Sequence, residues 1–480
     1  MSDSHDLTFA PQVEYVKKIL LNPSYRISKL IPLTGQGLTL GVSSTMNTQF
    51  ELQTNVMNLA RSRLAFDITI PYAGAGVYNW CLADPLALFD RIQLYTRSGV
   101  SLIDIQGVNN FSSLVTPYKT KLQDLLQRSL GGTQINGLVS TTINSVVATD
   151  SNQVPIQGLQ ACNGAMAVNF RPDGTGSADS FVEQRHLFQS VAGVAFVQAQ
   201  VAPLPVVAGV AQQGFMTLSY QMNLSNLIHS LAEIDQDLYF GENLILSLTY
   251  APCQKFTWAS AVVNQPANAP TAPLTGSVIT NLSLYLSIET NLEVANALIA
   301  KTHSPEGFSI HVPYVYSQKY ASTAGSSSSI FQRFNRGHGS RILRFYYGLF
   351  NTAETLNSTL DHSNVGNGKI LNYYSTMNNL RCQEFPVDCT QSLDWLVNSD
   401  DIDHSSVLSV NQFKYQFCHM ENYSGQRPCE CHDTTITGLD LNQEKTYGVY
   451  VNTVATAFNH WLFTVIQREL RIGGGQIMFV

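Results

Sequence analysis

The feature that most constrains the fold is an alternation of apolar and polar residues that fills two long stretches of the chain. The first stretch runs from about residue 64 to residue 288, and the second from residue 308 to the last residue. Alternation with a period of two is typical of β-strands that bury one face. Gly, Pro, Asn and Ser separate the runs, as expected for a sandwich or barrel. The pattern therefore predicts an all-β fold in two halves.

Strand candidates in the first half carry the clearest alternation. In NLSLYLSIET, four apolar residues from Leu282 to Ile288 share one face and alternate with Ser and Tyr. The segment LALFDRIQLYTRSGVSLIDIQG predicts a strand, a turn at Ser98 and Gly99, and a second strand. A helix is predicted after it, through Leu122 and Leu130, which Gly131 ends. Further strands are predicted in RSRLAFDITIP, FMTLSYQMN and ENLILSLTYAP.

The second half repeats the pattern. Its predicted strands are GFSIHVPYVY, SRILRFYYGLF, KILNYYSTM, VNQFKYQF, KTYGVYVNTVA and WLFTVIQRELRI, and ASTAGSSSS is predicted as a loop. With about eight candidates in each half, the eight-stranded jelly roll is the best architectural match, so we expect two jelly-roll sandwiches in tandem.

The length of 480 residues exceeds what one hydrophobic core usually fills. We predict an N-terminal arm over residues 1–40 with a short amphipathic helix, PQVEYVKKILLN, which either packs on its own domain or docks elsewhere. A neighbouring subunit, a minor protein and a membrane surface are the docking partners considered. The first jelly roll is predicted over residues 41–302, with a long loop insertion at about 131–213, and the second over 303–480. A helix, NLEVANALIAK, is expected to connect the two stiffly.

The charge balance excludes some functions. Only 13% of the residues are charged, against about 25% in a typical soluble domain, and the net charge is −7. A chain that coats nucleic acid needs clustered Lys and Arg, so no direct nucleic-acid binding is expected. The start, MSDSHDLTFAPQVEY, lacks the features of a signal peptide, and eight cysteines are too few for a disulfide scaffold. The sequence therefore predicts synthesis inside a cell.

No catalytic signature is present in the sequence. It contains no Gly-x-Ser-x-Gly elbow, phosphate-binding loop, dinucleotide fingerprint or His-Glu-x-x-His motif. Asp400, Asp401 and Asp403 beside His404 fit a metal or acid–base site, but NSDDIDHSS is more typical of a helix cap or a solvated loop. We therefore predict no catalytic residue, no cofactor and no enzymatic activity.

A group of thiols and imidazoles in the second half supplies a second set of candidate metal ligands. Its members are Cys382, Cys389, Cys418, His419, Cys429, Cys431 and His432. Zinc is the metal that such a set would hold, but Cys-Glu-Cys-His does not have the usual ligand spacing. Ordinary buried or loop cysteines are the favoured interpretation. Zinc binding and a disulfide formed after assembly or cell lysis stay open as alternatives.

Two further groups of residues have a structural and a functional interpretation. Basic residues gather at Arg333, Arg336, His338 and Arg341, and again at Arg468 and Arg471. Ion pairs across strands or subunits are favoured there over phosphate contacts. The 21 Tyr and 23 Phe either fill cores and interfaces or form a stacking platform for sugars, and the presence of only four Trp favours the first.

The order of these elements resembles a known family. LFDRIQLYTRSGVSLIDIQG precedes a helical segment, a helical bridge follows NLSLYLSIET, and the second half contains RFNRGHGSRILRFYYGLF. In this order the chain is similar to the double jelly-roll major capsid proteins of the adenovirus and tectivirus lineage, above all those of Polinton-like viruses and virophages. The resemblance covers nearly the whole chain and rests on element order, since the family has no short diagnostic motif.

The resemblance implies a function and a set of partners. Three copies would form a pseudo-hexameric capsomer, and capsomers would build an icosahedral shell around a DNA genome. The partners implied are neighbouring capsomers, and penton and minor capsid proteins reached through the N-terminal arm. The location implied is the virion; an internal membrane is compatible with the family, but nothing in the sequence indicates one. Two alternatives stay open: a glycan-binding or glycan-cleaving β-sandwich protein, and a minor or vertex capsid protein.

Overall fold

The structure is a computed structural model that describes only certain residues of the chain. These are residues 24–34, 38–40, 46–71, 78–81, 85–119, 140–141, 148–149, 186–191, 194–196, 215–253, 258–259, 272–273, 276–322, 325–351, 370–388, 418–423 and 438–479.

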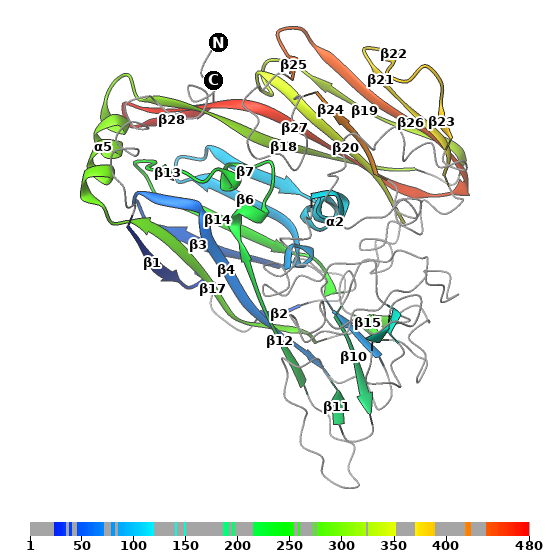
Figure 1. The fold of residues 1–480 in the computed structure, drawn as a ribbon, viewed down its shortest axis with the longest axis horizontal. Helices are drawn as coiled ribbons and strands as arrows, with labels where there is room; N and C mark the ends of the chain where they lie inside the picture. The colour runs from blue at the N-terminus through cyan, green and yellow to red at the C-terminus, as the bar shows by residue number, and fades with distance from the viewer. Residues whose placement is uncertain are drawn as a thin grey trace.

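Two antiparallel sheets form the first sandwich (Figure 1). One sheet has the order β1 (Tyr25–Leu30), β17 (Val278–Glu289), β4 (Met57–Pro71), β12 (Phe215–Asn223). The other has the order β3 (Met46–Leu52), β14 (Leu244–Tyr250), β6 (Phe89–Thr96), β7 (Ser101–Gln106). When these eight strands are lettered B to I in chain order, the sheets read B-I-D-G and C-H-E-F. That order is the jelly roll.

The second sandwich repeats this topology. One sheet has the order β18 (Phe308–Ala321), β27 (Phe458–Gly473), β20 (Arg341–Asn351), β24 (Cys418–Asn422), which is again B-I-D-G. The other has the order β19 (Gly325–Phe334), β26 (Lys445–Thr456), β21 (Ile370–Met377), followed by β22 (Leu380–Arg381). A second short strand, β23 (Val387–Asp388), also pairs with β21. The fold is therefore a double jelly roll whose second F strand is reduced to two short pieces.

A separate sheet extends from the first sandwich. Its order is β11 (Val194–Phe196), β10 (His186–Val191), β5 (Tyr78–Cys81), β15 (Trp258–Ala259), β16 (Ala272–Pro273). These strands come from the D–E, F–G and H–I connections, which leave a jelly roll at the same end. The helix α5 (Leu292–His303) lies at the opposite end, where it joins strand I of the first sandwich to strand B of the second.

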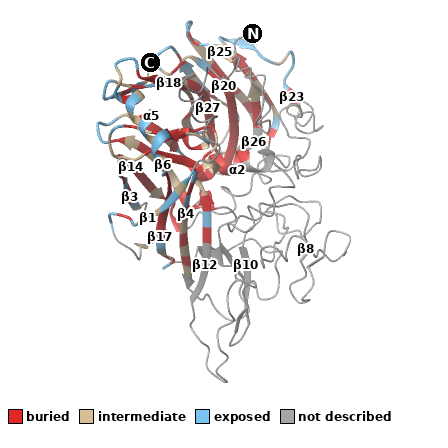
Figure 2. Cartoon of the chain, turned by 60° about the vertical axis from the view of Figure 1, so that its left-hand side comes forward, coloured by how far each residue is buried: buried red, intermediate tan, exposed pale blue. Residues whose placement is uncertain are grey.

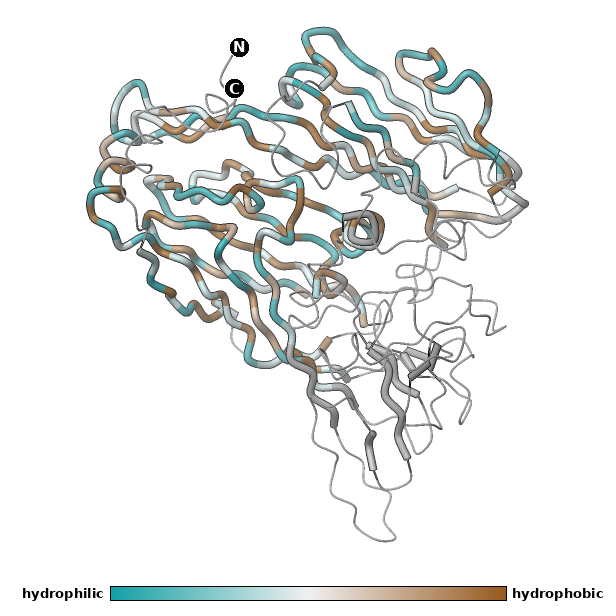
Figure 3. The backbone as a smooth tube through the Cα atoms, in the orientation of Figure 1, coloured by the Kyte–Doolittle hydropathy of each residue, from teal (hydrophilic) through white to brown (hydrophobic). Residues whose placement is uncertain are grey.

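Alternating side chains account for the strands and the cores. In β17, Leu284, Leu286 and Ile288 are buried in the core of the first sandwich, while Tyr285 lies on the outer face. The same alternation of hydrophobic and hydrophilic residues follows the strands of both sandwiches (Figure 3). In the core of the second sandwich, the rings of Phe345 and Tyr447 stack with centroids 3.7 Å apart. Helix α5 begins after Asn291, whose side chain accepts a hydrogen bond from the backbone N–H of Glu293.

Most strands predicted from the sequence are present, including the β6–β7 hairpin, and so is the helix after residue 291. One prediction was wrong: most of ASTAGSSSS is not a loop, because its serines begin β19 and pair with β26. Strands β1 and β3 were not predicted. The helix in the first half, α2, spans Val108–Lys119. The helix predicted through Leu122 and Leu130, the strand predicted in VNQFKYQF, the N-terminal helix and most of the 131–213 insertion lie outside the described residues.

The exact boundaries predicted for the arm and the two jelly rolls stay a prediction. Residues 25–30 fall in the segment assigned to the arm, yet they form β1 and pair along β17 from Tyr25 opposite Glu289 to Leu30 opposite Leu284. The B strand of the first sandwich therefore starts at Tyr25. The linker α5 connects the last strand of one sandwich to the first strand of the other.

Candidate functional site: the junction between the two sandwiches

The two sandwiches meet across a sheet that is buried on both faces. The first ten residues of β27, Phe458 to Gln467, are all buried. Trp461, Phe463 and Val465 belong to the same apolar cluster as the first core, whereas Leu462 and Ile466 belong to the second core. Buried residues follow both β27 and β20 in Figure 2. The B-I-D-G sheet of the second sandwich thus closes its own core with one face and covers the first sandwich with the other.

The first sandwich presents its F-strand edge to this sheet. Strand β18 packs beside β7, and the hydroxyl groups of Ser101 and Tyr314 lie 3.4 Å apart across the contact. Between Ser101 and Ile103 the register of the β6–β7 pairing shifts, and Leu102 at this shift is fully buried in the apolar cluster that also holds Val312 and Trp461 of the second sandwich. One continuous apolar cluster therefore spans the contact.

Two glycines allow close approach at the junction. The indole ring of Trp461 lies on Gly107, and a Cβ there would come within 2.6 Å of ring carbons. Gly107 also has a φ of +66°, which residues with a side chain rarely adopt. On β20, a Cβ on Gly348 would collide with the side chain of Leu114 in α2. Helix α2 can sit on the second sandwich because glycine occupies the facing position.

An aromatic group fills the space between α2 and the sheet. The rings of Phe111 and Phe463 have centroids 4.9 Å apart, and Phe463 stacks on Trp461 at 5.4 Å. Tyr346 meets Phe111 edge to face at 5.8 Å. Such pairs contribute about 0.5–1.5 kcal/mol each beyond their buried area. The contact has the composition of a domain core, so the two sandwiches are fixed relative to each other.

Polar contacts set the register of the junction. His229, in the segment after β12, lies 2.7 Å through Nε2 from the hydroxyl of Tyr346. Within the first sandwich and beside this contact, Arg91 of β6 and Asp104 of β7 form a bidentate ion pair with both distances at 2.7 Å. Burial raises the pKa of Tyr314, and the charge of Asp104 raises it further. These contacts add directionality to an interface that is mainly apolar.

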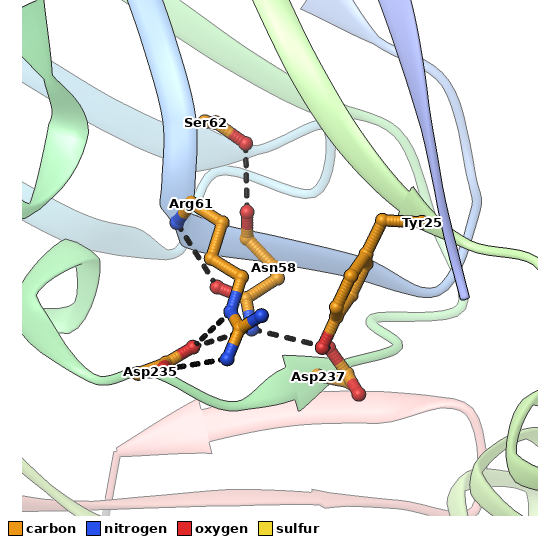
Figure 4. A network of polar contacts seen from close by, with 6 residues as sticks. All are labelled: Tyr25, Asn58, Arg61, Ser62, Asp235 and Asp237. Carbon is orange, nitrogen blue, oxygen red and sulfur yellow. Dashed lines mark hydrogen bonds and ion pairs between the residues drawn. The ribbon is translucent and has the colours of Figure 1, made fainter. Parts of the chain in front are cut away.

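A second polar network holds strand β1 in the first sandwich (Figure 4). The hydroxyl of Tyr25 donates to Asp237 at 2.9 Å, and the amide of Asn58 donates to Asp235 and Asp237 at 2.9 and 3.2 Å. Arg61 donates twice to Asp235, at 2.8 and 3.0 Å, and its guanidinium lies 4.9 Å from the centre of the Tyr25 ring. Burial raises the pKa of Tyr25, which therefore acts as a hydrogen-bond donor. The network ties the B strand to the D strand.

The second sandwich contains a buried carboxylate that sequence reasoning missed. Glu421 of β24 accepts hydrogen bonds from Tyr423 at 2.5 Å and from Ser375, and it lies 2.9 Å from His419 Nε2. Burial alone raises the pKa of Glu421, but these hydrogen bonds and the charge of His419 lower it to about 2. The carboxylate is satisfied within the core, so the cluster stabilises the fold and is not aimed at a ligand.

The predicted metal candidates are not brought together in the part of the chain that the structure describes. Cys382 is exposed as a residue, but its thiol is partly buried beside Glu421, and that burial together with the charge of Glu421 raises the pKa of the thiol. Cys418 lies in β24, and His419 is engaged with Glu421. Within the described ranges no group of three or more His, Cys, Asp or Glu could hold a metal ion. The remaining candidates lie outside them: Cys389, Cys429, Cys431, His432, and the acidic run Asp400, Asp401, Asp403 with His404.

Most of the basic residues singled out in the sequence lie against other parts of the chain. Arg333 pairs with Glu444 at 3.1 Å, and Arg336 donates to Asn442 at 3.1 Å. His338 lies 3.0 Å from Asn335. Arg468 lies between aromatic rings, 3.7 Å from the centre of Phe479 and 4.8 Å from that of Tyr314. Arg341 faces Asp440 in the β20–β25 pair, β25 being Leu439–Asp440, and Arg471 is exposed on β27.

None of the helices in the described part of the chain is long and apolar enough to cross a bilayer.

Comparisons with known proteins identify the fold. No protein-family model matches the chain, and no curated protein sequence matches it at a significant level. A chain in the cryo-EM structure of the Sputnik virophage aligns with a TM-score of 0.54 and 11% identity, over 96% of this chain and 89% of that chain. A chain of the PBCV-1 virus capsid aligns with a TM-score of 0.51 and 9% identity, over 96% and 97% of the two chains. Both alignments extend over both sandwiches, so the whole double jelly roll is shared.

Proposed function

We propose that this chain is a viral major capsid protein whose function is to assemble. Three copies form a pseudo-hexameric capsomer, and capsomers tile an icosahedral shell that encloses a DNA genome. The observation that carries the proposal is the junction: two sandwiches of the same topology are fixed to each other by a sheet buried on both faces. The likeness over 96% of the chain to chains from a virophage and from a virus capsid supports it.

The mechanism is geometric. Within one chain, the F edge of one sandwich contacts the B-I-D-G face of the other, so the contact joins two different surfaces of the same fold. A contact between unlike surfaces generates a ring when its rotation closes. Two lobes per chain and three chains give six similar lobes, which is a footprint that packs in a plane. The apolar junction therefore contributes to function by fixing the angle between the two sandwiches, which are the two lobes of the chain.

The topology also suggests which end faces outward. The D–E, F–G and H–I connections of the first sandwich contribute the extra sheet of β5, β10, β11, β15 and β16 at one end. Strand β1 begins at the other end, where α5 and the end of β27 also lie. We assign the long connections to the exterior of the shell. Penton and minor capsid proteins then meet the N-terminal segment from inside, and the protein resides in the virion.

The genome is not expected to bind this chain directly. The net charge is −7, and two of the candidate phosphate-binding arginines, Arg333 and Arg468, are engaged by Glu444 and by aromatic rings. Phosphate binding needs cations that are available to the ligand. Another component therefore neutralises the charge of the genome. In this proposal the chain is a structural subunit and not an enzyme.

The glycan-binding alternative is disfavoured by how the outer aromatic residues lie. On the outer face of the β19-β26-β21-β22 sheet, Tyr374 stacks on Tyr450 with centroids 4.7 Å apart. The guanidinium of Arg381 lies 4.4 Å from the centre of the Tyr374 ring, and Phe331 meets Tyr450 edge to face. A sugar-binding platform presents an open ring face, whereas Tyr374 has Tyr450 and Arg381 as stacking partners. These residues serve the sheet itself.

The molecular mass of the protein in solution tests the proposed function. Light scattering of the purified full-length chain should give a stable trimer across protein and salt concentrations. A monodisperse monomer under all of these conditions would rule out the capsomer.

A further inference from the structure

The contact within one chain predicts which surfaces meet between chains. In that contact the F strand of the first sandwich, β7, and the following helix α2 lie against the B, I and D strands of the second. Each chain therefore retains one F edge that is not used, on the second sandwich, and one B-I-D-G outer face that is not used, on the first. A ring built by repeating the same contact has to join these two surfaces.

The unused F edge carries exposed apolar side chains. Leu380 in β22 is 75% exposed and Phe385, between β22 and β23, is 57% exposed. Glu384 is also exposed. Strand β22 is the counterpart of β7, the F strand of the first sandwich, which packs beside β18 of the second. We call Leu380, Glu384 and Phe385 the F-edge patch.

The unused outer face of the B-I-D-G sheet in the first sandwich carries an exposed apolar side chain beside basic side chains. Ile27 on β1 is 70% exposed, and the pairing of β1 with β17 places it on the outer face, because Ser28 and Leu30 oppose the core residues Leu286 and Leu284. Beside it, Lys29 pairs across β17 with Tyr285, which pairs with Arg63 on β4. We call Ile27, Lys29 and Arg63 the B-face patch.

We propose that the F-edge patch of one chain docks on the B-face patch of a second copy of this chain. Three such contacts alternate with the three internal junctions and close the ring of six lobes. Leu380 and Phe385 pack against Ile27, and Glu384 lies opposite the basic row of Lys29 and Arg63.

The occupant is argued from shape and charge together. Both surfaces expose apolar side chains, and Glu384 on the F edge is a counterpart for the basic B-face patch, while Arg381 of the same edge stacks on Tyr374. Repetition of the internal contact between unlike surfaces favours a ring of copies over a two-fold dimer. The network of Tyr25, Asn58, Arg61, Asp235 and Asp237 holds β1 against the sheet, which gives the B-face patch a fixed support.

This inference rests on the proposed function, and two experiments separate them. The first compares Leu380→Asp and Ile27→Asp with Leu292→Asp. Leu292 lies at the start of α5, outside both patches, and is 74% exposed, so it matches Leu380 in chemistry and exposure. Light scattering should show loss of the trimer in the two patch variants and a trimer in the control. Glu384→Lys should weaken the trimer, and adding Arg63→Glu should restore it.

The second experiment locates the contact in the intact particle. A benzoylphenylalanine photo-crosslinker replaces Phe385, and mass spectrometry identifies the peptides joined between chains. Crosslinks to the peptide around Ile27 support the proposal. A trimer that survives both patch substitutions, or crosslinks only to other surfaces, overturns it and leaves the capsomer standing. A wild-type chain that is never trimeric overturns both.

Discussion

The indole ring of Trp461 lies on the backbone of Gly107, so close that a Cβ at that position would come within 2.6 Å of the ring. Gly107 follows the F strand of the first sandwich, and Trp461 lies on the I strand of the second. The position of the two lobes relative to each other therefore depends on the absence of a side chain at Gly107.

Gly107→Ala should destabilise the junction. Alanine at a positive φ costs about 1–2 kcal/mol in any setting, and here the new methyl group also displaces Trp461. Gly474 is a matched control, because its φ is +58° and nothing lies within 4 Å of its Cβ position. Thermal unfolding should show a clearly larger loss of Tm for Gly107→Ala than for Gly474→Ala. Equal losses would mean that Trp461 is not held against this glycine.

Leu114 and Gly348 should be energetically coupled. Leu114→Ala should cost about 2–5 kcal/mol through the cavity that it leaves, and Gly348→Ala about 1–3 kcal/mol through overpacking. In the double variant the added methyl group occupies space that the leucine vacated. A double-mutant cycle from denaturant unfolding should give a cost below the sum by at least about 0.5 kcal/mol. Strict additivity would show that α2 does not pack on β20 as described.

Glu421→Gln should destabilise the second sandwich at neutral pH. Removing one partner of a buried charge pair costs about 3–5 kcal/mol. The control Glu444→Gln, in the exposed pair with Arg333, should cost less than about 1 kcal/mol.

The effect of Glu421 should also depend on pH. Its folded pKa, about 2, lies below its unfolded value of 4.5, so its contribution is complete above pH 4.5 and is lost as the pH falls toward 2. The difference in unfolding free energy between Glu421→Gln and wild type should therefore shrink over this window. A difference that stays constant would contradict an ionised Glu421 in the core.

His460 should make the protein less stable as the pH falls below neutral. Burial lowers the pKa of His460 from 6.5 to about 4, and its ring contacts the hydroxyls of Tyr347 and Ser328 at 2.6 and 2.9 Å. Between these pH values the unfolded chain binds a proton that the folded chain excludes, so stability falls by up to about 1.4 kcal/mol per pH unit. His460→Gln should remove that part of the slope in unfolding measurements from pH 7 to 4. Identical slopes for the two proteins would refute the buried neutral imidazole.

The sequence predicts much of this fold because its strands obey simple alternation. The run through Leu282, Leu284, Leu286 and Ile288 identifies β17 without any tertiary information. The serines of β19 mislead, because serine favours turns and only the pairing with β26 makes that segment a strand. Strand propensity is weaker than tertiary pairing at such positions.

The junction could be predicted only in part. The run Trp461-Leu462-Phe463 has no polar alternation, which is the signal of a strand buried on both faces. Its partners Gly107 and Phe111 are far away in the sequence, and nothing in their local pattern marks them as interface residues. Likewise, nothing in the sequence around Glu421 indicates the hydrogen bonds that stabilise its charged carboxylate in the core.

The most direct test of the account is electron microscopy of the purified chain, because the central claim is that a fixed pair of lobes becomes a six-lobed unit. Class averages should show particles with a hexagonal outline and six similar lobes, two from each of three chains. Isolated two-lobed particles at every concentration, or oligomers in which the angle between the two lobes of a chain varies, would contradict it.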